Sequence, residues 1–128
     1  MPFDDAIKLV VWKNASCVTG FDPDKYRKDP CGAWIIFDEY NNIDSIYGWE
    51  IDHIFPKSLL EKKGVTLKII DDINNLRVMQ WENNRAKGND YPTYQSVVSA
   101  KDNKNIYTEK SLTVNAEIQN SLQQLYQL

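Results

Sequence analysis

The chain has 128 residues, of which 42% are hydrophobic and 26% charged, and its formal net charge is −3. This length suits one domain with a hydrophobic core and is short for two, so we predict a single domain over residues 1–128. The negative charge argues against nonspecific binding of nucleic acid through overall charge, although it leaves room for a local basic patch.

Neither a membrane protein nor a cysteine-rich zinc protein is expected. No apolar run approaches the ~20 residues of a membrane span, and Asp4 and Asp5 stand where a secretory signal needs basic residues, which predicts a cytoplasmic protein. The two cysteines, Cys17 and Cys31, form no C-x-x-C pair. We therefore expect no zinc ribbon and no disulfide, but two mostly buried thiols.

A helix is expected over residues 3–14, with a strand that begins at Val10 as the alternative. Its apolar residues recur at helical spacing and form one stripe, made of Phe3, Ile7, Val10 and Val11. Residues 20–30 then read as a connector, in which we expect Arg27 to be surface charge.

A β-hairpin is predicted over residues 32–54. Residues 33–37 are rich in β-formers and residues 46–54 supply the return strand, with an Asn-containing turn between them. A long connection over residues 57–72 follows. Gly64 is expected to break it, and three apolar residues to pin it to the core: Leu67, Ile69 and Ile70.

A short strand at residues 75–79 leads into a short helix at residues 81–87, with Gly88 placed to stop it. Residues 91–128 carry a weaker signal and are predicted to be a helical extension. Its apolar stripe is expected to pack on the domain's own core, and consists of Val114, Ile118, Leu122 and Leu125.

The most informative stretch surrounds the only histidine, His53, which follows Asp52. Side chains alternate along a strand, so the pair can serve one site only if the strand ends or bends there. Pro56 favours an end at about His53. An Asp supplies a hard oxygen ligand and a His supplies a base that is neutral near pH 7, so the pair suits a one-metal hydrolytic site.

The wider pattern resembles the HNH endonuclease motif, also called the His-Me finger. The matching residues are Asp52-His53 with Ile54 and Pro56, Asn75-Leu76, and Asn84 with Lys87-Gly88. The nine-residue spacing from Asn75 to Asn84 is similar to that in the HNH domain of RNA-guided CRISPR nucleases, where the last signature residue is also Asn. Residues 21–90 resemble small stand-alone HNH proteins of bacteria and phages.

The resemblance implies an α+β fold with a ββα-metal core over residues 48–90, flanked by the N-terminal helix, the β-hairpin and the C-terminal helix. His53 would be the general base. Asp52 and Asn84 would bind one divalent metal ion, with Mg²⁺ preferred and Mn²⁺ as the alternative. Asn75 would hold the loop and orient His53 through a hydrogen bond.

Basic residues near the motif are candidate phosphate contacts, namely Arg85, Lys87 and Lys57. Glu82 is an additional candidate metal ligand. Asn74 and Asn83 precede the two motif asparagines and leave a one-residue ambiguity in register. We choose Asn75 because it directly precedes Leu76, and Asn84 because it keeps the Asn-x-x-Lys spacing.

The predicted activity is metal-dependent hydrolysis of DNA phosphodiester bonds, which leaves 5′-phosphate and 3′-hydroxyl ends. One ββα site buries little DNA, so a homodimer or a protein partner is also expected. Two alternatives remain open from the sequence: a nucleic-acid-binding module with a silent site, and a subunit that binds a protein partner.

Overall fold

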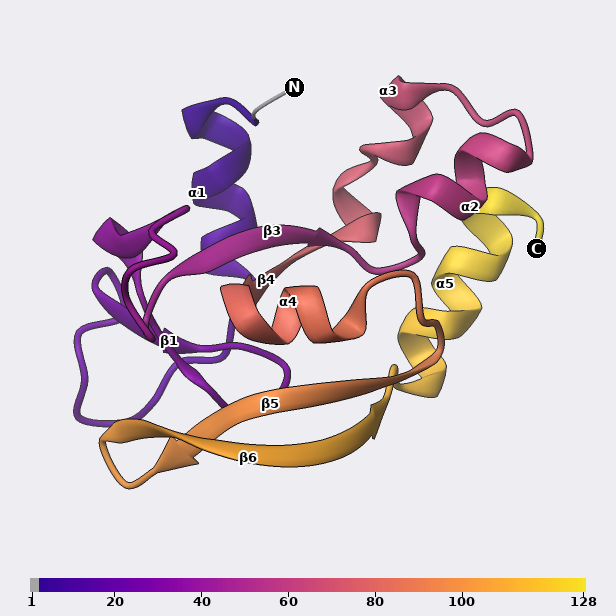
Figure 1. The fold of residues 1–128 in the computed structure, drawn as a ribbon. Helices are drawn as coiled ribbons and strands as arrows, with labels where there is room; N and C mark the ends of the chain where they lie inside the picture. Colours follow the sequence, from indigo (N-terminus) through magenta and orange to yellow (C-terminus); the bar gives the residue numbers. More distant parts are fainter. Residues whose placement is uncertain (1–2) are drawn as a thin grey trace.

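The computed structural model describes residues 3–128, and it has an α+β fold (Figure 1). The strands pair into three separate two-stranded antiparallel sheets: β1 with β2, β3 with β4, and β5 with β6. Within the described residues no helix is both long and apolar enough to cross a membrane. The helices are α1 (Asp5–Lys13), α2 (Lys57–Lys62), α3 (Leu67–Ile70), α4 (Trp81–Lys87) and α5 (Ala116–Tyr126). The strands are β1 (Tyr26–Lys28), β2 (Trp34–Ile36), β3 (Trp49–His53), β4 (Leu76–Gln80), β5 (Thr93–Lys101) and β6 (Lys104–Thr113).

The N-terminal helix α1 confirms the helical prediction. Asp4 caps it, because its carboxylate accepts a hydrogen bond from the backbone N–H of Ile7 at 2.8 Å. Three residues of the predicted stripe, Phe3, Ile7 and Val11, do contact the core, but Val10 is 46% exposed and Trp12 is buried instead. The indole of Trp12 packs against Trp49 and so turns this face of the helix toward the core.

The predicted β-hairpin over residues 32–54 is wrong. Its two strands exist as β2 and β3, but they lie in different sheets. β2 pairs with β1, a strand inside the predicted connector, and β3 pairs with β4. β-propensity locates strands without choosing their partners, and here each strand pairs outside the predicted hairpin.

Arg27 of β1 is buried, which contradicts its predicted role as surface charge. Its guanidinium donates hydrogen bonds to the backbone carbonyls of Pro23 at 2.8 Å, Lys13 at 3.1 Å and Ala15 at 3.0 Å. It thereby ties the end of α1 to the first sheet.

β3, β4 and α4 form a compact unit at the centre of the molecule. The antiparallel register runs from Trp49 opposite Gln80 to His53 opposite Leu76. β3 ends at His53 as predicted, and the predicted strand and helix match β4 and α4 closely. Gly88 follows α4 with a φ of +51°, a conformation that favours glycine.

The connection between β3 and β4 contains α2 and α3, with Gly64 between them as the predicted break. Of the three residues predicted to pin it, only Ile70 is buried, while Leu67 and Ile69 are 44% and 48% exposed. α3 is a single turn, so it presents only one apolar side chain to the core.

The predicted helical extension over residues 91–128 is correct only at its end. Residues 93–113 form the long β5–β6 hairpin, and α5 follows, capped by Asn115. Polar Ser96 and Asn105 occupy buried strand positions and obscure the apolar alternation that predicts strands. Leu122 of α5 is fully buried in the core, which confirms that this helix packs on its own domain.

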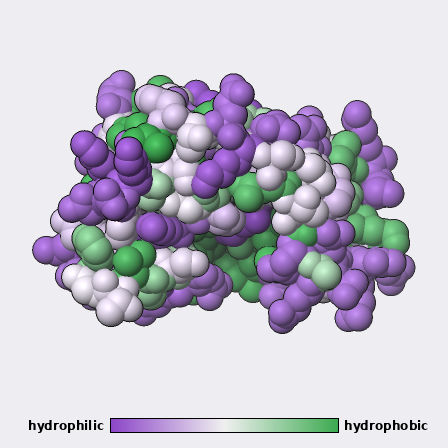
Figure 2. Space-filling model, turned by 90° about the horizontal axis from the view of Figure 1, so that it is seen from below, coloured by the Kyte–Doolittle hydropathy of each residue, from purple (hydrophilic) through white to green (hydrophobic). Residues whose placement is uncertain are grey.

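Two hydrophobic clusters flank the central unit. One lies between α1 and the β3–β4 sheet and contains Trp12, Trp49 and Val78, and the other gathers Leu60, Ile70 and Leu122 from α2, α3 and α5. In Figure 1, α4 lies between the β3–β4 sheet and the β5–β6 hairpin. Figure 2 shows the molecule from below the view of Figure 1. This face is largely hydrophilic, with hydrophobic residues in a hollow near its middle.

Asp29 fixes the position of α4 within this arrangement. Its buried carboxylate accepts hydrogen bonds from the backbone of Cys31 and Ala33 at 2.9 Å, from that of Gln80 at 3.0 Å, and from the Asn83 side chain at 3.1 Å. Burial raises the pKa of Asp29, and the four donors oppose that shift. The carboxylate therefore joins the first sheet to the start of α4.

Both cysteines carry free thiols, as expected. Cys31 is buried in the core, and burial raises the pKa of its thiol to about 12. Cys17 is exposed, so the expectation of burial holds for only one of the two.

Candidate active site

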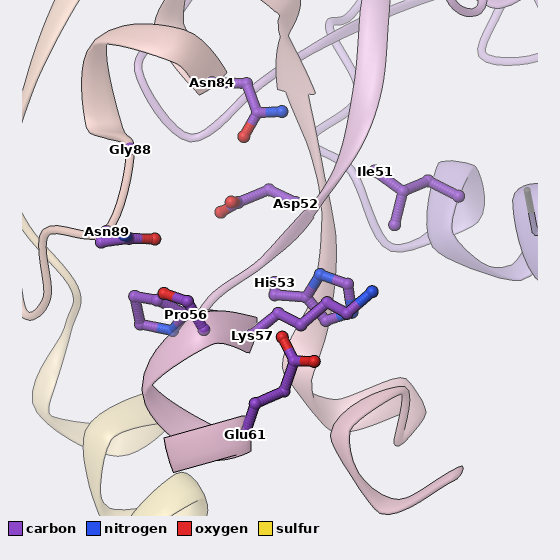
Figure 3. Close-up of a pocket in the computed structure, with 10 residues that line it drawn as sticks. Ile51, Asp52, His53, Pro56, Lys57, Glu61, Asn84, Gly88 and Asn89 are labelled. Atoms are coloured by element: carbon purple, nitrogen blue, oxygen red, sulfur yellow. The ribbon is translucent and has the colours of Figure 1, made fainter. Parts of the chain in front are cut away.

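An open pocket of about 360 Å³ lies where the end of β3, the start of α2 and the end of α4 meet (Figure 3). It is lined by Ile51, Asp52, His53, Pro56, Lys57, Ser58, Glu61, Asn84, Gly88 and Asn89. Four residues of the predicted site therefore share one pocket: the catalytic and metal-binding candidates Asp52, His53 and Asn84, and the candidate phosphate contact Lys57.

Asp52 and His53 leave β3 in different directions, as strand alternation requires. In Figure 3, Asp52 extends from β3 to the side of Asn84 and α4, whereas the His53 ring extends to the opposite side. Both still line the pocket because β3 ends at His53 and the chain turns into α2. The predicted end of the strand thus explains how adjacent residues can serve one site.

The Asp52 side chain is buried between two cations. Its Oδ2 accepts from Arg77 Nε at 3.2 Å, and its Oδ1 from Lys87 Nζ at 3.4 Å. Charge-assisted bonds of this kind are typically about 2.8 Å long, so both contacts are loose. A carboxylate offers about four lone-pair directions, which leaves Asp52 capacity for a further cation.

The prediction that Lys87 contacts a phosphate is wrong, because its ammonium group is buried. Its side chain is 0% exposed, and Nζ donates to Asp52 and to the backbone carbonyl of His53 at 3.2 Å. Burial lowers the pKa of Lys87, and the nearby Asp52 carboxylate opposes that shift. Lys87 instead braces the end of β3 against α4.

Asn84 presents its side-chain oxygen toward Asp52 (Figure 3). Its Nδ2 donates to Glu50 Oε1 at 3.0 Å, and within residues 3–128 its Oδ1 makes no hydrogen bond. Glu50 lies two residues before Asp52 and so on the same face of β3. The Glu50 bond fixes the amide so that its oxygen is the free atom.

Asp52 and Asn84 together form a donor set suited to a hard divalent cation. Mg²⁺ prefers oxygen ligands and is usually held by one or two protein groups together with several waters. Asp52 from β3 and Asn84 from α4 bring one carboxylate and one amide oxygen of this kind to the pocket. The part of the chain that the structure describes contains no cluster of three or more His, Cys, Asp or Glu side chains able to hold a metal.

His53 is hydrogen-bonded to Asp71, a residue that the sequence did not single out. The Nε2 atom of His53 lies 2.7 Å from Asp71 Oδ1, and the His53 side chain is 17% exposed. The predicted bond from Asn75 to His53 is wrong, because the Asn75 side chain bonds to Phe55 and Ile70 instead.

Asn75 does hold the loop between β3 and β4, as predicted. It is 0% exposed. Its Oδ1 accepts from Phe55 N at 2.7 Å, and its Nδ2 donates to the carbonyls of Phe55 at 3.1 Å and Ile70 at 3.3 Å. One side chain therefore fixes the start and the end of this connection.

The structure distinguishes the neighbouring asparagines in both pairs. Asn74 is exposed and bonds to Asp72, so it makes no contact across the loop. Asn83 is fully buried, and its Oδ1 accepts from the backbone N–H groups of Val97 and Val98 at 2.8 Å. It joins α4 to β5, whereas Asn84 lines the pocket.

The remaining predicted residues differ in their access to a substrate. Lys57 lines the pocket, and Arg85 is 55% exposed, with an ion pair to Glu50 at 3.4 Å. Glu82 faces away, because its carboxylate accepts from Gln80 and from the Tyr107 hydroxyl. Glu82 is not among the residues that line the pocket, so its position does not support the suggestion that it binds a metal there.

Sequence reasoning missed three acidic residues at the site: Glu50, Glu61 and Asp71. Glu50 could have been inferred from its i, i+2 spacing to Asp52 on a strand. Glu61 lines the pocket one helical turn after Lys57, which α2 would have indicated. Asp71 had no such signal, because it lies 18 positions after His53, beyond α2 and α3.

A scan against protein-family models and searches of curated proteins and of solved structures find no match to this chain.

Proposed function

We propose that this protein is a metal-dependent HNH endonuclease, with β3, β4 and α4 as its ββα-metal core. The observation that carries the proposal is the convergence of Asp52, His53 and Asn84 on one open pocket. These residues come from the end of a strand and from the helix after its antiparallel partner, in the order of the motif.

Asp52 and Asn84 would hold one divalent cation, Mg²⁺ or Mn²⁺, through their side-chain oxygens. When bound, such a cation stabilises the added negative charge on a phosphodiester and on its leaving oxygen. Glu50 supports this role of Asn84, because it holds Nδ2 and leaves Oδ1 available.

His53 would act as the general base. A base that works near neutral pH has to be uncharged, and imidazole is the side chain best suited to this. It would take a proton from the water whose oxygen attacks phosphorus, on the side opposite the leaving 3′ oxygen. The products would be a 5′-phosphate and a 3′-hydroxyl. His53 is the single histidine of the chain, so no other imidazole competes for the role.

A nucleic-acid backbone is the substrate that this set of groups suits, and we propose DNA. Lys57 lines the pocket and Arg85 is exposed beside it, so both can contact phosphates that flank the cleaved bond. The overall charge of −3 means that such local contacts have to supply the affinity. Cutting a duplex would then call for a second copy or a protein partner.

Cleavage of supercoiled plasmid tests the proposal. Purified protein is incubated with EDTA, Mg²⁺, Mn²⁺ or Zn²⁺, beside His53→Ala and the exposed-surface control Lys101→Ala. We expect nicked or linear product with Mg²⁺ or Mn²⁺ only, from wild type and the control but not from His53→Ala. Binding of DNA without cleavage under any metal would contradict an active nuclease and favour a silent binding module.

A further inference from the structure

We infer that Asp71 is the positioning residue for His53, and that it holds the imidazole in the tautomer whose Nδ1 accepts the proton. This deepens the proposed function and depends on it for its catalytic meaning. The tautomer itself can be measured without any substrate.

The hydrogen bond defines which nitrogen carries the proton. An ionised carboxylate can only accept, so Asp71 Oδ1 at 2.7 Å requires His53 Nε2 to donate. In a neutral imidazole the other nitrogen then has the lone pair. Nδ1 is therefore the atom available to take a proton from water.

The side chain of Asp71 serves this contact and no other within residues 3–128. It is 31% exposed, and its one hydrogen-bond and ion-pair partner is His53. The neighbouring Asp72 differs in this respect, because its carboxylate accepts from the backbone N–H of Asn74 at 2.9 Å and caps a short 3₁₀ turn.

The backbone that carries Asp71 is held from two sides. The carbonyl of Ile70, the residue before it, accepts from Asn75 Nδ2 at 3.3 Å and from the Tyr126 hydroxyl at 3.1 Å. Tyr126 belongs to α5, and its one hydroxyl proton is shared between this carbonyl and that of Ile69, at 2.9 Å. Burial, with help from nearby Asp72, raises the pKa of Tyr126 to about 12, so its hydroxyl stays a donor.

This arrangement gives Asn75 and the C-terminal helix an indirect role at the site. Each fixes the end of α3, and the end of α3 presents Asp71 to His53. The ring of Phe3 also packs near the imidazole, with its centroid 5.9 Å from that of His53. The imidazole is thus confined by an aromatic ring and oriented by a carboxylate.

Nuclear magnetic resonance with ¹⁵N-labelled histidine tests the inference directly, because the chain contains one histidine. For wild type at a pH where His53 is neutral, we expect a protonated Nε2, an unprotonated Nδ1 and an Hε2 proton protected from exchange with water. Asp71→Ala should lose that protection. Asp72→Asn removes the same charge from the next residue but keeps its capping oxygen, so it should match wild type.

Cleavage kinetics supply the catalytic test. Misplacing a reacting group by about 1 Å can cost a factor of about 10² in rate, so we expect Asp71→Ala to lower kcat about 10- to 100-fold with KM nearly unchanged. Asp72→Asn should cleave like wild type. Circular dichroism and thermal melting check that both variants fold.

Two results would overturn the inference. One is a wild-type spectrum with the proton on Nδ1, or an Hε2 signal that Asp71→Ala leaves unchanged. The other is equal loss of cleavage in Asp71→Ala and Asp72→Asn, which would point to charge rather than to the hydrogen bond. Failure of wild type to cleave any DNA would instead refute the proposed nuclease, whatever the spectrum shows.

Discussion

Replacement of Asn75 by alanine should destabilise the fold strongly, although it removes only one small polar side chain. The change leaves the buried N–H and C=O of Phe55 without their partner and takes one of two donors from the Ile70 carbonyl. An unsatisfied buried polar group costs about 1–3 kcal/mol. The N–H and C=O of Phe55 lose their hydrogen bonds and the missing side chain leaves a small cavity. We therefore expect the free energy of unfolding to fall by about 2–5 kcal/mol.

Urea unfolding followed by circular dichroism measures this loss, with Asn74→Ala as the matched control. Asn74 is exposed and bonds only within its own turn, so its replacement should change stability by less than about 1 kcal/mol. If Asn75→Ala costs less than the control, Asn75 does not hold the loop and the assignment of the motif register is wrong.

Three further predictions address the fold and the metal site. Arg27→Ala should lower the free energy of unfolding in urea by about 2–4 kcal/mol, because three backbone carbonyls lose a charged donor. The control Lys25→Ala replaces an exposed residue and should change this free energy by no more than about 0.5 kcal/mol. Equal effects of the two changes would refute a bracing role for Arg27. Asp29→Asn should lower the free energy of unfolding by about 2–4 kcal/mol although the two side chains have nearly the same shape, because an amide cannot accept from four converging donors. An unchanged unfolding midpoint would contradict this prediction. Asp52→Asn and Asn84→Ala should each weaken Mg²⁺ or Mn²⁺ binding at least about tenfold in calorimetry, and wild-type affinity in both would refute the ligand assignment.

The central unit could be predicted because its signals are local. Pro56 marks the end of β3, Gly88 the end of α4, and the motif spacing locates β4 between them. Pairing of the other strands could not be predicted in the same way. Arg27, Ser96 and Asn105 are polar yet buried. Arg27 and Asn105 hydrogen-bond to backbone groups that are distant in the sequence, and no local pattern indicates such partners.

The candidate site was predictable in its residue types and less so in its contacts. Asp52, His53 and Asn84 line one pocket as the motif suggests. Lysine is almost never fully buried, so the sequence favoured an exposed Lys87. The burial of Lys87 depends on the Asp52 carboxylate, which accepts a hydrogen bond from its ammonium group. The Asp71 contact depends on how the α2–α3 connection folds back, which no spacing rule specifies.

Single-turnover cleavage by wild type and His53→Ala at saturating Mg²⁺, with Mg²⁺ affinity measured on the same samples, tests the central claim most directly. Loss of a general base lowers a rate by about 10²–10⁴-fold. We predict a loss of that size in His53→Ala with metal affinity and fold unchanged. Cleavage at the wild-type rate by His53→Ala, or cleavage by wild type that EDTA does not abolish, would contradict a metal-dependent nuclease with His53 as its base.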